Sequence, residues 1–395
     1  MKKVELLAPA GDLGRLKLAL IYGADAVYIG GKSLSLRTFA SNFSREDIKE
    51  GVEFAHKLNK KVYVACNMVL HQEDDVDTLE YLKYLKSVNV DAIIISSLYI
   101  LKLANSIGLE AHMSTQLSIL NSEAISFLAK QNTSRVVLGR ECSLSEIEGI
   151  CRQSPVEIEV FIHGGMCSSY SGKCMLSNVM CDRDPNRGGC AHSCRWKYHL
   201  YDENGPLMDD ENYLSISSKD LCTISLIPSL IKAGVSSLKI EGRMKSHNYL
   251  AYIISAYRKC IDDYYDGKPL NLEEYMSYIS YGENRLTGHG FLYGNVTKNE
   301  MLFDLSNKFD HAGEFIGIIR GYDKNKKVAT LEVKNKIIKG EKYFVLSPHL
   351  KNREVKVLNM SYQNNDVDVY TIAGDMIEIQ TDIELKEYDL IHIIR

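Results

Sequence analysis

The residues best able to do chemistry in this 395-residue chain are cysteines concentrated in one segment. Five of the ten cysteines lie between His163 and Tyr198, and four of these follow the spacing Cys-x6-Cys-x15-Cys-x3-Cys. The four are Cys167, Cys174, Cys190 and Cys194. The segment is dense in Gly, Ser, Asn, Asp and Arg, which predicts a loop rather than a helix or strand. Because such a loop buries too few side chains to hold itself in place, we expect a bound metal or cluster to hold it.

Four thiolates are the ligand set of structural zinc and of an iron–sulfur cluster. Structural zinc sites usually carry close pairs of cysteines, and here only Cys190 and Cys194 are close, so the spacing leans towards a cluster. Zinc at the same positions stays an alternative, as does a set of unliganded thiols. Cys181 and Cys222 are spare ligand candidates. The other cysteines fall in expected strands and helices and are interpreted as packing residues: Cys66, Cys142, Cys151 and Cys260.

Charged side chains at the ends of predicted strands form a second set of candidates. His163 follows the seventh predicted strand and could move a proton. Arg140 follows the sixth, and Lys239, Glu241 and Arg243 end the eighth. An arginine can bind a carboxylate substrate through two N–H groups at once. Because all five residues are expected at one face of the fold, they are the catalytic candidates. The alternative is structural, with a packed histidine and a set of salt bridges that close the fold.

Positive charge and an aromatic ring coincide in the second half of the cysteine segment. This combination suits the binding of phosphates and the stacking of an unpaired base. The RNA-binding candidates are Arg183, Arg187, Arg195, Trp196 and Lys197. The formal net charge of −4 gives the whole chain no attraction to nucleic acid, so RNA contact would depend on such a local group. Alternatively, the arginines pair with nearby aspartates or with the cluster, and Trp196 only covers it.

The elements that must position these residues alternate between short apolar runs and amphipathic helical patterns. Eight runs have the length and β-branched composition of buried parallel strands. They are residues 4–7, 26–29, 62–65, 92–95, 110–113, 135–138, 157–162 and 236–240. Capping signals begin some of the helices, as at Ser143 with Glu146 three residues later. Eight strand–helix units favour a (β/α)8 barrel, and a doubly wound open sheet is the runner-up.

In a (β/α)8 barrel the active site lies at the C-terminal ends of the strands. The cysteine segment would be an insertion at that face, after the seventh strand. Residues 247–266 predict a closing helix, residues 270–310 an irregular crossing, and the alternating pattern from Gly313 a small antiparallel β-barrel. The predicted division is a barrel domain at 1–268 with the cluster loop at 163–198, a connecting segment at 269–310 and a C-terminal domain at 311–395.

The composition is that of an ordinary globular chain, with 45% hydrophobic and 25% charged residues. The N-terminus has too short an apolar run for a signal peptide, and no run approaches the roughly 20 apolar residues of a membrane span. We therefore expect a cytoplasmic protein with no membrane partner. In that compartment cysteines are thiols or ligands rather than disulfides.

The cysteine segment and several shorter motifs resemble peptidase family U32, and most closely its branch that hydroxylates tRNA uridine. In the segment the matching residues are His163-Gly164, Cys167, Tyr170-Ser171-Gly172, Cys174, Leu176-Ser177, Arg183-Asp184, Asn186-Arg187-Gly188, Cys190 and Cys194-Arg195-Trp196. The shorter motifs are Leu6-Leu7-Ala8-Pro9-Ala10-Gly11, Gly23-Ala24-Asp25-Ala26-Val27-Tyr28, Ser218-Lys219-Asp220-Leu221 and residues 238–246. The resemblance spans most of residues 4–295, with a matching C-terminal extension.

The resemblance implies prephenate-dependent 5-hydroxylation of a tRNA uridine at the wobble position. It implies a 4Fe–4S cluster at the four cysteines. As our own hypothesis, Arg140, Lys239 and Arg243 bind the dicarboxylate co-substrate. Its partners would be tRNA, the co-substrate and, as in some members, a related U32 chain. The alternatives are a collagenase-like peptidase, another RNA hydroxylase and a non-catalytic RNA-binding protein. The sequence contains neither His-Glu-x-x-His nor Gly-x-Ser-x-Gly, so it offers no peptidase motif of those kinds.

Overall fold

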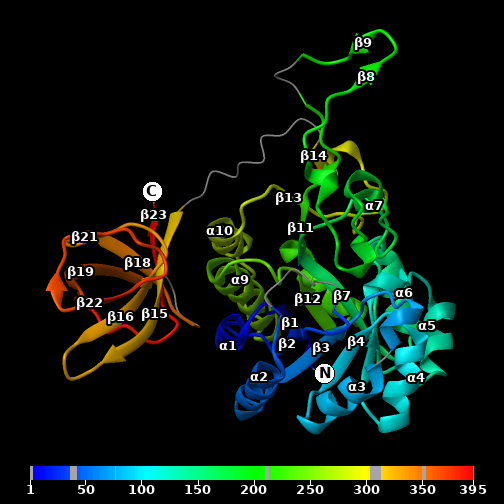
Figure 1. Ribbon diagram of the computed structural model, residues 1–395, viewed down its shortest axis with the longest axis horizontal. Coiled ribbons are helices and arrows are strands. Elements are labelled where there is room, and N and C mark those ends of the chain that lie inside the picture. Colours follow the sequence, from blue (N-terminus) through cyan, green and yellow to red (C-terminus); the bar gives the residue numbers. More distant parts are fainter. Residues whose placement is uncertain are drawn as a thin grey trace.

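The computed structural model describes residues 3–35, 42–75, 77–209, 213–302, 313–348 and 353–394. Eight parallel strands form a closed barrel in the order β12-β1-β2-β3-β4-β5-β6-β7, and β12 also pairs with β7. Their bounds are β1 Glu5–Pro9, β2 Ala26–Gly30, β3 Lys61–Cys66, β4 Ala92–Ile95, β5 Ala111–Met113, β6 Arg135–Val137, β7 Glu157–Gly164 and β12 Ser237–Ile240. The closing pair confirms the predicted (β/α)8 barrel and excludes the open sheet (Figure 1).

Amphipathic helices surround the strands and bury their apolar faces against them. Their bounds are α1 Leu13–Ile21, α2 Arg45–Lys57, α3 Thr78–Ser87, α4 Leu98–Ile107, α5 Ser122–Ala129, α6 Leu144–Gln153, α8 Ile227–Ala233 and α9 His247–Tyr265. Ser143 and Glu146 form the predicted capping box at the start of α6. Within the described residues, no helix has both the length and the apolar character that crossing a bilayer requires.

The insertion after β7 rises from the C-terminal ends of the barrel strands (Figure 1). It was predicted as loop, and the structure adds a six-residue helix, α7 (Leu176–Cys181), with turns of 3-10 helix at Pro185–Arg187 and Ser193–Arg195. Buried Ser177 ties these pieces together by accepting a hydrogen bond from the Ala191 amide at 3.1 Å. A hairpin of β8 (Tyr201–Asp202) and β9 (Gly205–Pro206) projects beyond them, and β10 (Ser217–Ser218) leads back to the barrel. Strand β11 (Asp220–Cys222) then returns antiparallel to β7.

The connection between the two domains is less irregular than predicted. It contains helix α10 (Leu272–Gly282), capped by Asn271 and packed along α9. Tyr275, Tyr278 and Ile279 recur at helical spacing and are buried, so the apolar pattern for this helix was present in the sequence. Two short strands follow, β13 (Thr287–Gly288) beside β11 and β14 (Met301–Leu302) beside β10.

The C-terminal part is the predicted antiparallel β-barrel. Six strands close in the order β18-β23-β15-β16-β22-β19, and β18 pairs with β19. Their bounds are β15 Gly313–Asp323, β16 Val328–Val333, β18 Lys342–Leu346, β19 Arg353–Tyr362, β22 Met376–Thr381 and β23 Leu390–Ile394, with short β17 (Ile337–Ile338), β20 (Asn365–Asp366) and β21 (Val369–Tyr370) at the side. Alternate side chains of these strands point inward and form a second buried cluster.

The two barrels also share buried contacts. The Tyr22 hydroxyl on the barrel side donates to the carbonyl oxygens of Leu346 and Tyr388, at 2.9 and 2.8 Å. Tyr252 of α9 hydrogen-bonds the His392 ring at 2.8 Å. Because these polar groups are buried and paired across the boundary, they fix how the C-terminal barrel docks.

Candidate active site

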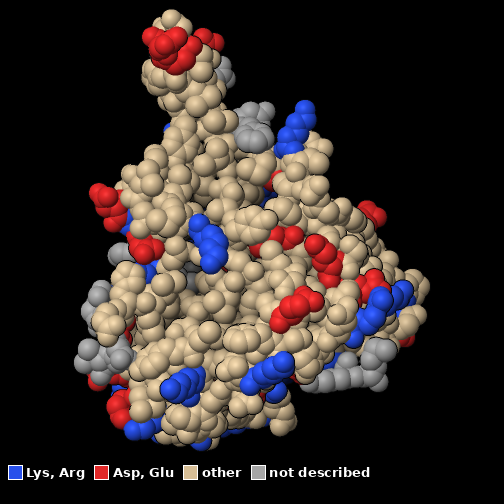
Figure 2. All heavy atoms as spheres, turned by 90° about the vertical axis from the view of Figure 1, so that its right-hand side faces the viewer, with Lys and Arg blue, Asp and Glu red and all other residues tan. Residues whose placement is uncertain are grey.

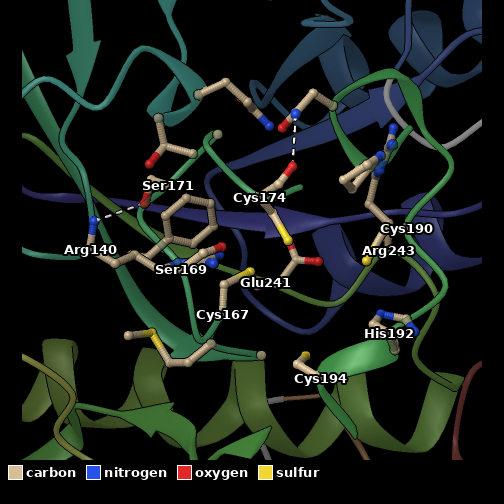
Figure 3. Close-up of a pocket in the computed structure, with 18 of the residues that line it drawn as sticks. Arg140, Cys167, Ser169, Ser171, Cys174, Cys190, His192, Cys194, Glu241 and Arg243 are labelled. Carbon is tan, nitrogen blue, oxygen red and sulfur yellow. Dashed lines mark hydrogen bonds between the residues drawn. The ribbon is translucent and has the colours of Figure 1, made fainter. Parts of the chain in front are cut away.

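A cavity of about 370 Å³ opens at the C-terminal ends of the barrel strands, under the inserted segment. All four predicted cysteine ligands line it, together with the candidates Arg140, Lys239, Glu241 and Arg243. Figure 3 shows the cysteine side chains arranged around the cavity, with Arg140 and Glu241 beside them. The structure therefore brings together in one place the metal-ligand set and the charged set that the sequence separates by up to about 100 residues.

The four cysteine thiols are near enough to influence one another. Enclosure in the cavity raises the pKa of Cys167, Arg140 opposes this, and Cys194, Cys190 and Cys174 raise the pKa further. The spare candidates lie elsewhere. Cys181 is in α7, with its thiol against its own helix at 3.2 Å from the Ser177 oxygen, and Cys222 is buried behind the cavity wall.

Four cysteine thiolates are the ligand set of an iron–sulfur cluster and of a zinc ion. In the parts of the chain that the structure describes, no three His, Cys, Asp or Glu side chains converge as one metal ion requires. A single zinc ion needs its four ligands within about 2.3 Å of one point, whereas the thiolates of a 4Fe–4S cluster bind different iron atoms and stand further apart. The four cysteines line one cavity, so both kinds of centre stay candidates at this place.

The first half of the cysteine loop is fastened to the barrel through Ser171. The Glu141 carboxylate accepts hydrogen bonds from the Ser171 amide at 2.8 Å and its hydroxyl at 3.1 Å. The next residue, Gly172, has a φ of +72°, and a Cβ there would lie 2.2 Å from the Gln116 oxygen. The loop can therefore approach this closely only with glycine. Glu141 was not among the sequence candidates, although its place directly after Arg140 was a usable signal.

The second half of the loop is fastened by two of the arginines that were RNA-binding candidates. Arg187 forms an ion pair with Asp74 and donates to the Val69 oxygen at 2.9 Å, so it joins the loop to the segment after β3. Its hydrogen bond to Asp74 lowers the pKa of that carboxyl to about 2. Arg195 lies 3.8 Å from buried Asp220. Pairing with aspartates was the stated alternative, but the partners are distant in sequence rather than adjacent.

Three other RNA-binding candidates, Arg183, Trp196 and Lys197, lie on the exposed surface of the insertion. Trp196 is 38% exposed, and the Lys197 ammonium lies 4.1 Å from the centre of the Tyr213 ring. On the face shown in Figure 2, basic and acidic side chains alternate, and acidic side chains cover the tip of the projecting arm. RNA contact on this face would therefore depend on a few residues, as the net charge predicts.

The floor of the cavity carries buried, paired charges. Lys239 is 4% exposed and donates to Glu159 at 2.7 Å, and Arg135 binds the same carboxylate at 3.0 Å. The Tyr28 hydroxyl donates to Glu241 at 3.0 Å. Lys239 thus belongs to a salt-bridge network inside the barrel, as the structural alternative expects. Its side chain also lines the cavity, so it remains a candidate for substrate contact.

Arg243 and Arg140 face the cavity in different ways. Arg243 is buried and donates to the Ser35 hydroxyl at 3.1 Å. Gly30 makes room for it, since a Cβ at that position would lie 1.9 Å from the guanidinium. Arg140 stacks over the Phe161 ring at 3.9 Å and has no ion pair within the described residues. Its charge is therefore the one best placed to meet an anionic ligand in the cavity.

His163, one of the catalytic candidates, does not line the cavity. It is fully buried behind the lining, 3.3 Å from the carboxylate of Glu283 and 3.2 Å from the Tyr257 hydroxyl. Burial alone would lower the pKa of His163, but Cys222 and Glu283 raise it to about 9. Glu283 could not be found from the sequence, because it lies 120 residues from His163 at the end of a helix, α10, that was not predicted.

This buried pair predicts a pH dependence of stability. A pKa of His163 raised from 6.5 to about 9 adds stability that is complete below 6.5 and is lost as the pH rises through 9. At about 1.4 kcal/mol per pH unit, a shift of this size corresponds to a contribution of roughly 3–4 kcal/mol. As the pH is raised from 6.5 to 9, the urea concentration at the unfolding midpoint should therefore decrease in the wild type, and it should decrease less in Glu283→Gln. Equal pH profiles for the two proteins would contradict the pairing.

The fold and the site together define a class of protein: a (β/α)8 barrel with a cysteine-lined cavity at its C-terminal face. Residues 11–302 match the family described as peptidase family U32, and residues 312–392 match the U32 C-terminal domain. The chain therefore belongs to peptidase family U32, which confirms the resemblance noted in the sequence.

Curated relatives are named for different activities. The tRNA hydroxylation protein P1 of Bacillus subtilis is 42% identical over 89% of this chain and 85% of its own length. The 23S rRNA 5-hydroxycytidine C2501 synthase of Escherichia coli is 39% identical over 66% of this chain but 39% of its own length. A collagenase of Porphyromonas gingivalis is 36% identical over 67% of this chain.

Proposed function

We propose that this protein hydroxylates a uridine of tRNA at carbon 5, in the cytosol, with prephenate as co-substrate. The observation that carries the proposal is one cavity walled by four cysteines and an arginine without an ion pair in the described structure. The relative named for tRNA hydroxylation matches nearly the whole chain, whereas the rRNA enzyme matches two thirds of it. This difference favours tRNA over ribosomal RNA.

In this proposal Cys167, Cys174, Cys190 and Cys194 hold a 4Fe–4S cluster. The cluster would supply an iron centre capable of electron transfer or Lewis-acid chemistry at the cavity wall. The chain's own residues do the rest. Arg140 binds a carboxylate of the co-substrate by charge-assisted hydrogen bonds, and the Phe161 ring beneath it holds the guanidinium plane in place. Trp196 offers a ring for stacking an unpaired base at the rim.

The peptidase alternative finds no support in the geometry. Among the described residues, Cys222 lies with His163 and Glu283 in an arrangement that resembles a cysteine-protease triad, and all three side chains are buried. None of the three lines the cysteine cavity.

Substitution of Arg140 tests the proposed co-substrate contact. Loss of a charge-assisted hydrogen bond costs about 1.5–3 kcal/mol, so Arg140→Gln should raise the prephenate KM roughly 10- to 100-fold while the iron content stays the same. The matched control is Arg152→Gln, on the exposed surface of α6. Deletion cells complemented with each variant are then compared by mass spectrometry of tRNA nucleosides. No change in hydroxyuridine between deletion and wild-type cells would refute the hydroxylase and leave an RNA-binding or structural role.

A further inference from the structure

A second cavity, of about 630 Å³, lies between the barrel rim and the C-terminal β-barrel. From the barrel it is lined by the first residues of α1 and α9, including Gly14, Arg15 and His247. From the C-terminal domain it is lined by Arg320 and Lys334, with Glu332 between them. None of these residues lines the cysteine cavity.

Two helices begin at this cavity, and each has a backbone amide in its first turn without a hydrogen-bond acceptor in the described part of the chain. Asp12 caps α1 by accepting from the Arg15 amide, and Ser246 caps α9 by accepting from the Tyr249 amide. The amides of Gly14 and His247 have no acceptor in the described part of the chain. Unpaired N–H groups at a helix start, together with the helix dipole, attract anions.

The charge of the cavity is also positive on balance. Arg15 pairs with Asp12, and Arg320 and Lys334 share the single carboxylate of Glu332, so three cations face two carboxylates. Arg15, whose side chain is 22% exposed, and the partly buried His247 each have one nitrogen, Nε and Nε2 respectively, without a hydrogen-bond partner among the described residues. Burial, and then the nearby charge of Arg15, lowers the pKa of His247 to about 4, in keeping with a positive surrounding.

The two cavities are neighbours along one loop. Residues 241–245 line the cysteine cavity, and the next two, Ser246 and His247, line the second one. The loop is packed tightly against the β1–α1 turn, where a Cβ on Gly11 would lie 2.2 Å from the Arg243 carbonyl oxygen. A ligand long enough to pass over this loop can therefore occupy both cavities.

We propose that the second cavity binds a backbone phosphate of the RNA whose base enters the cysteine cavity. The inference rests on the proposed function for its RNA partner. Helix starts joined by arginine side chains are well suited to a phosphate, and (β/α)8 barrels commonly bind phosphate at loops of this face. A phosphate held here positions the strand while the neighbouring cavity reads the base.

The test places a carboxylate where the phosphate would lie. A Cβ on Gly14 meets Asp12 Oδ1 at 3.5 Å and His247 Nε2 at 3.6 Å, which are ordinary contacts, so both Gly14→Asp and Gly14→Asn fit. The Asn variant has the same shape without the charge and is the reference for the Asp variant. Acidic residues are favourable in the first turn of a helix, so loss of the fold is not expected.

The readout is tRNA binding by the full-length protein, measured by filter retention at several salt concentrations. Gly14→Asp should bind tRNA more weakly than Gly14→Asn, and its slope of log affinity against log salt should be lower by about 0.7–0.9 for one lost phosphate. The ratio of the two dissociation constants should accordingly narrow about threefold between 50 and 200 mM salt. Glu332→Gln, which removes a competing carboxylate, should change affinity in the opposite direction.

Equal tRNA affinities and slopes for the Asp and Asn variants would overturn the proposal. A second result would also overturn it: the two variants bind tRNA equally, but inorganic phosphate raises the melting temperature of the Asn variant and not of the Asp variant. The cavity would then bind a free phosphate ion rather than a phosphate of RNA. Binding needs no hydroxylation. A wild-type protein that binds tRNA in this charge-dependent way without forming hydroxyuridine would refute the proposed reaction and leave this site standing.

Discussion

Replacing Cys167, Cys174, Cys190 or Cys194 by Ser is expected to abolish iron binding in each case. The four thiols are the only side chains proposed to hold the cluster, and a cluster with three thiolates and one weak hydroxyl ligand is readily lost. Anaerobically purified wild-type protein should contain about four iron and four sulfide per chain, and each variant close to none. Because the cavity is open to solvent, the preparation must exclude oxygen.

Two other cysteines serve as matched controls for this prediction. Cys151 lies in α6, and Cys181 lies in the cysteine segment itself with its thiol against its own helix. Cys151→Ser and Cys181→Ser should both keep the wild-type iron content. Stoichiometric zinc without iron in the anaerobic wild type would replace the cluster by the zinc alternative. Loss of iron in Cys181→Ser would show that the ligand set has been assigned wrongly.

The site was predictable where the sequence carries chemistry in a local pattern. The four cysteines and the charged residues at or shortly after the ends of β6 and β12 were predicted to meet, and they line one cavity, because the ends of parallel strands meet at one face of a barrel. The fastening residues were not predictable in this way. Asp74 and Glu283 act through partners more than 100 residues away, and nothing in the local sequence distinguishes them from surface carboxylates.

The fold was predictable for a similar reason. Runs such as 92–95 and 26–29 are apolar on both faces, as strands buried within a barrel must be, and the observed β4 and β2 lie at those positions. Helix α10 was missed because turn residues around Pro269 outweighed a short apolar pattern. The docking of the two barrels depends on single pairs such as Tyr252 and His392, which only tertiary packing brings together.

The second large effect concerns Glu159, which is fully buried inside the barrel. Its carboxylate binds Lys239 at 2.7 Å and Arg135 at 3.0 Å. Burial alone would raise the pKa of Glu159, but these two cations lower it to about 2. Glu159→Gln leaves buried Lys239 without its carboxylate and removes one of the three carboxylates around Arg135, so it should cost about 3–5 kcal/mol of stability. Glu148→Gln, at an exposed ion pair with Arg152, should cost less than about 1 kcal/mol.

A double substitution separates the loss of the pair from the exposure of an unpaired charge. If most of the cost in Glu159→Gln comes from uncompensated Lys239, adding Lys239→Met should restore part of it, because a neutral side chain needs no carboxylate. Arg135 would keep its pairs with Glu5 and Glu157, both at 2.6 Å. Urea denaturation of the four proteins measures the coupling. Strictly additive effects would show that Glu159 stabilises the barrel through Arg135 alone, and that Lys239 extends from the floor of the cavity as an independent charge.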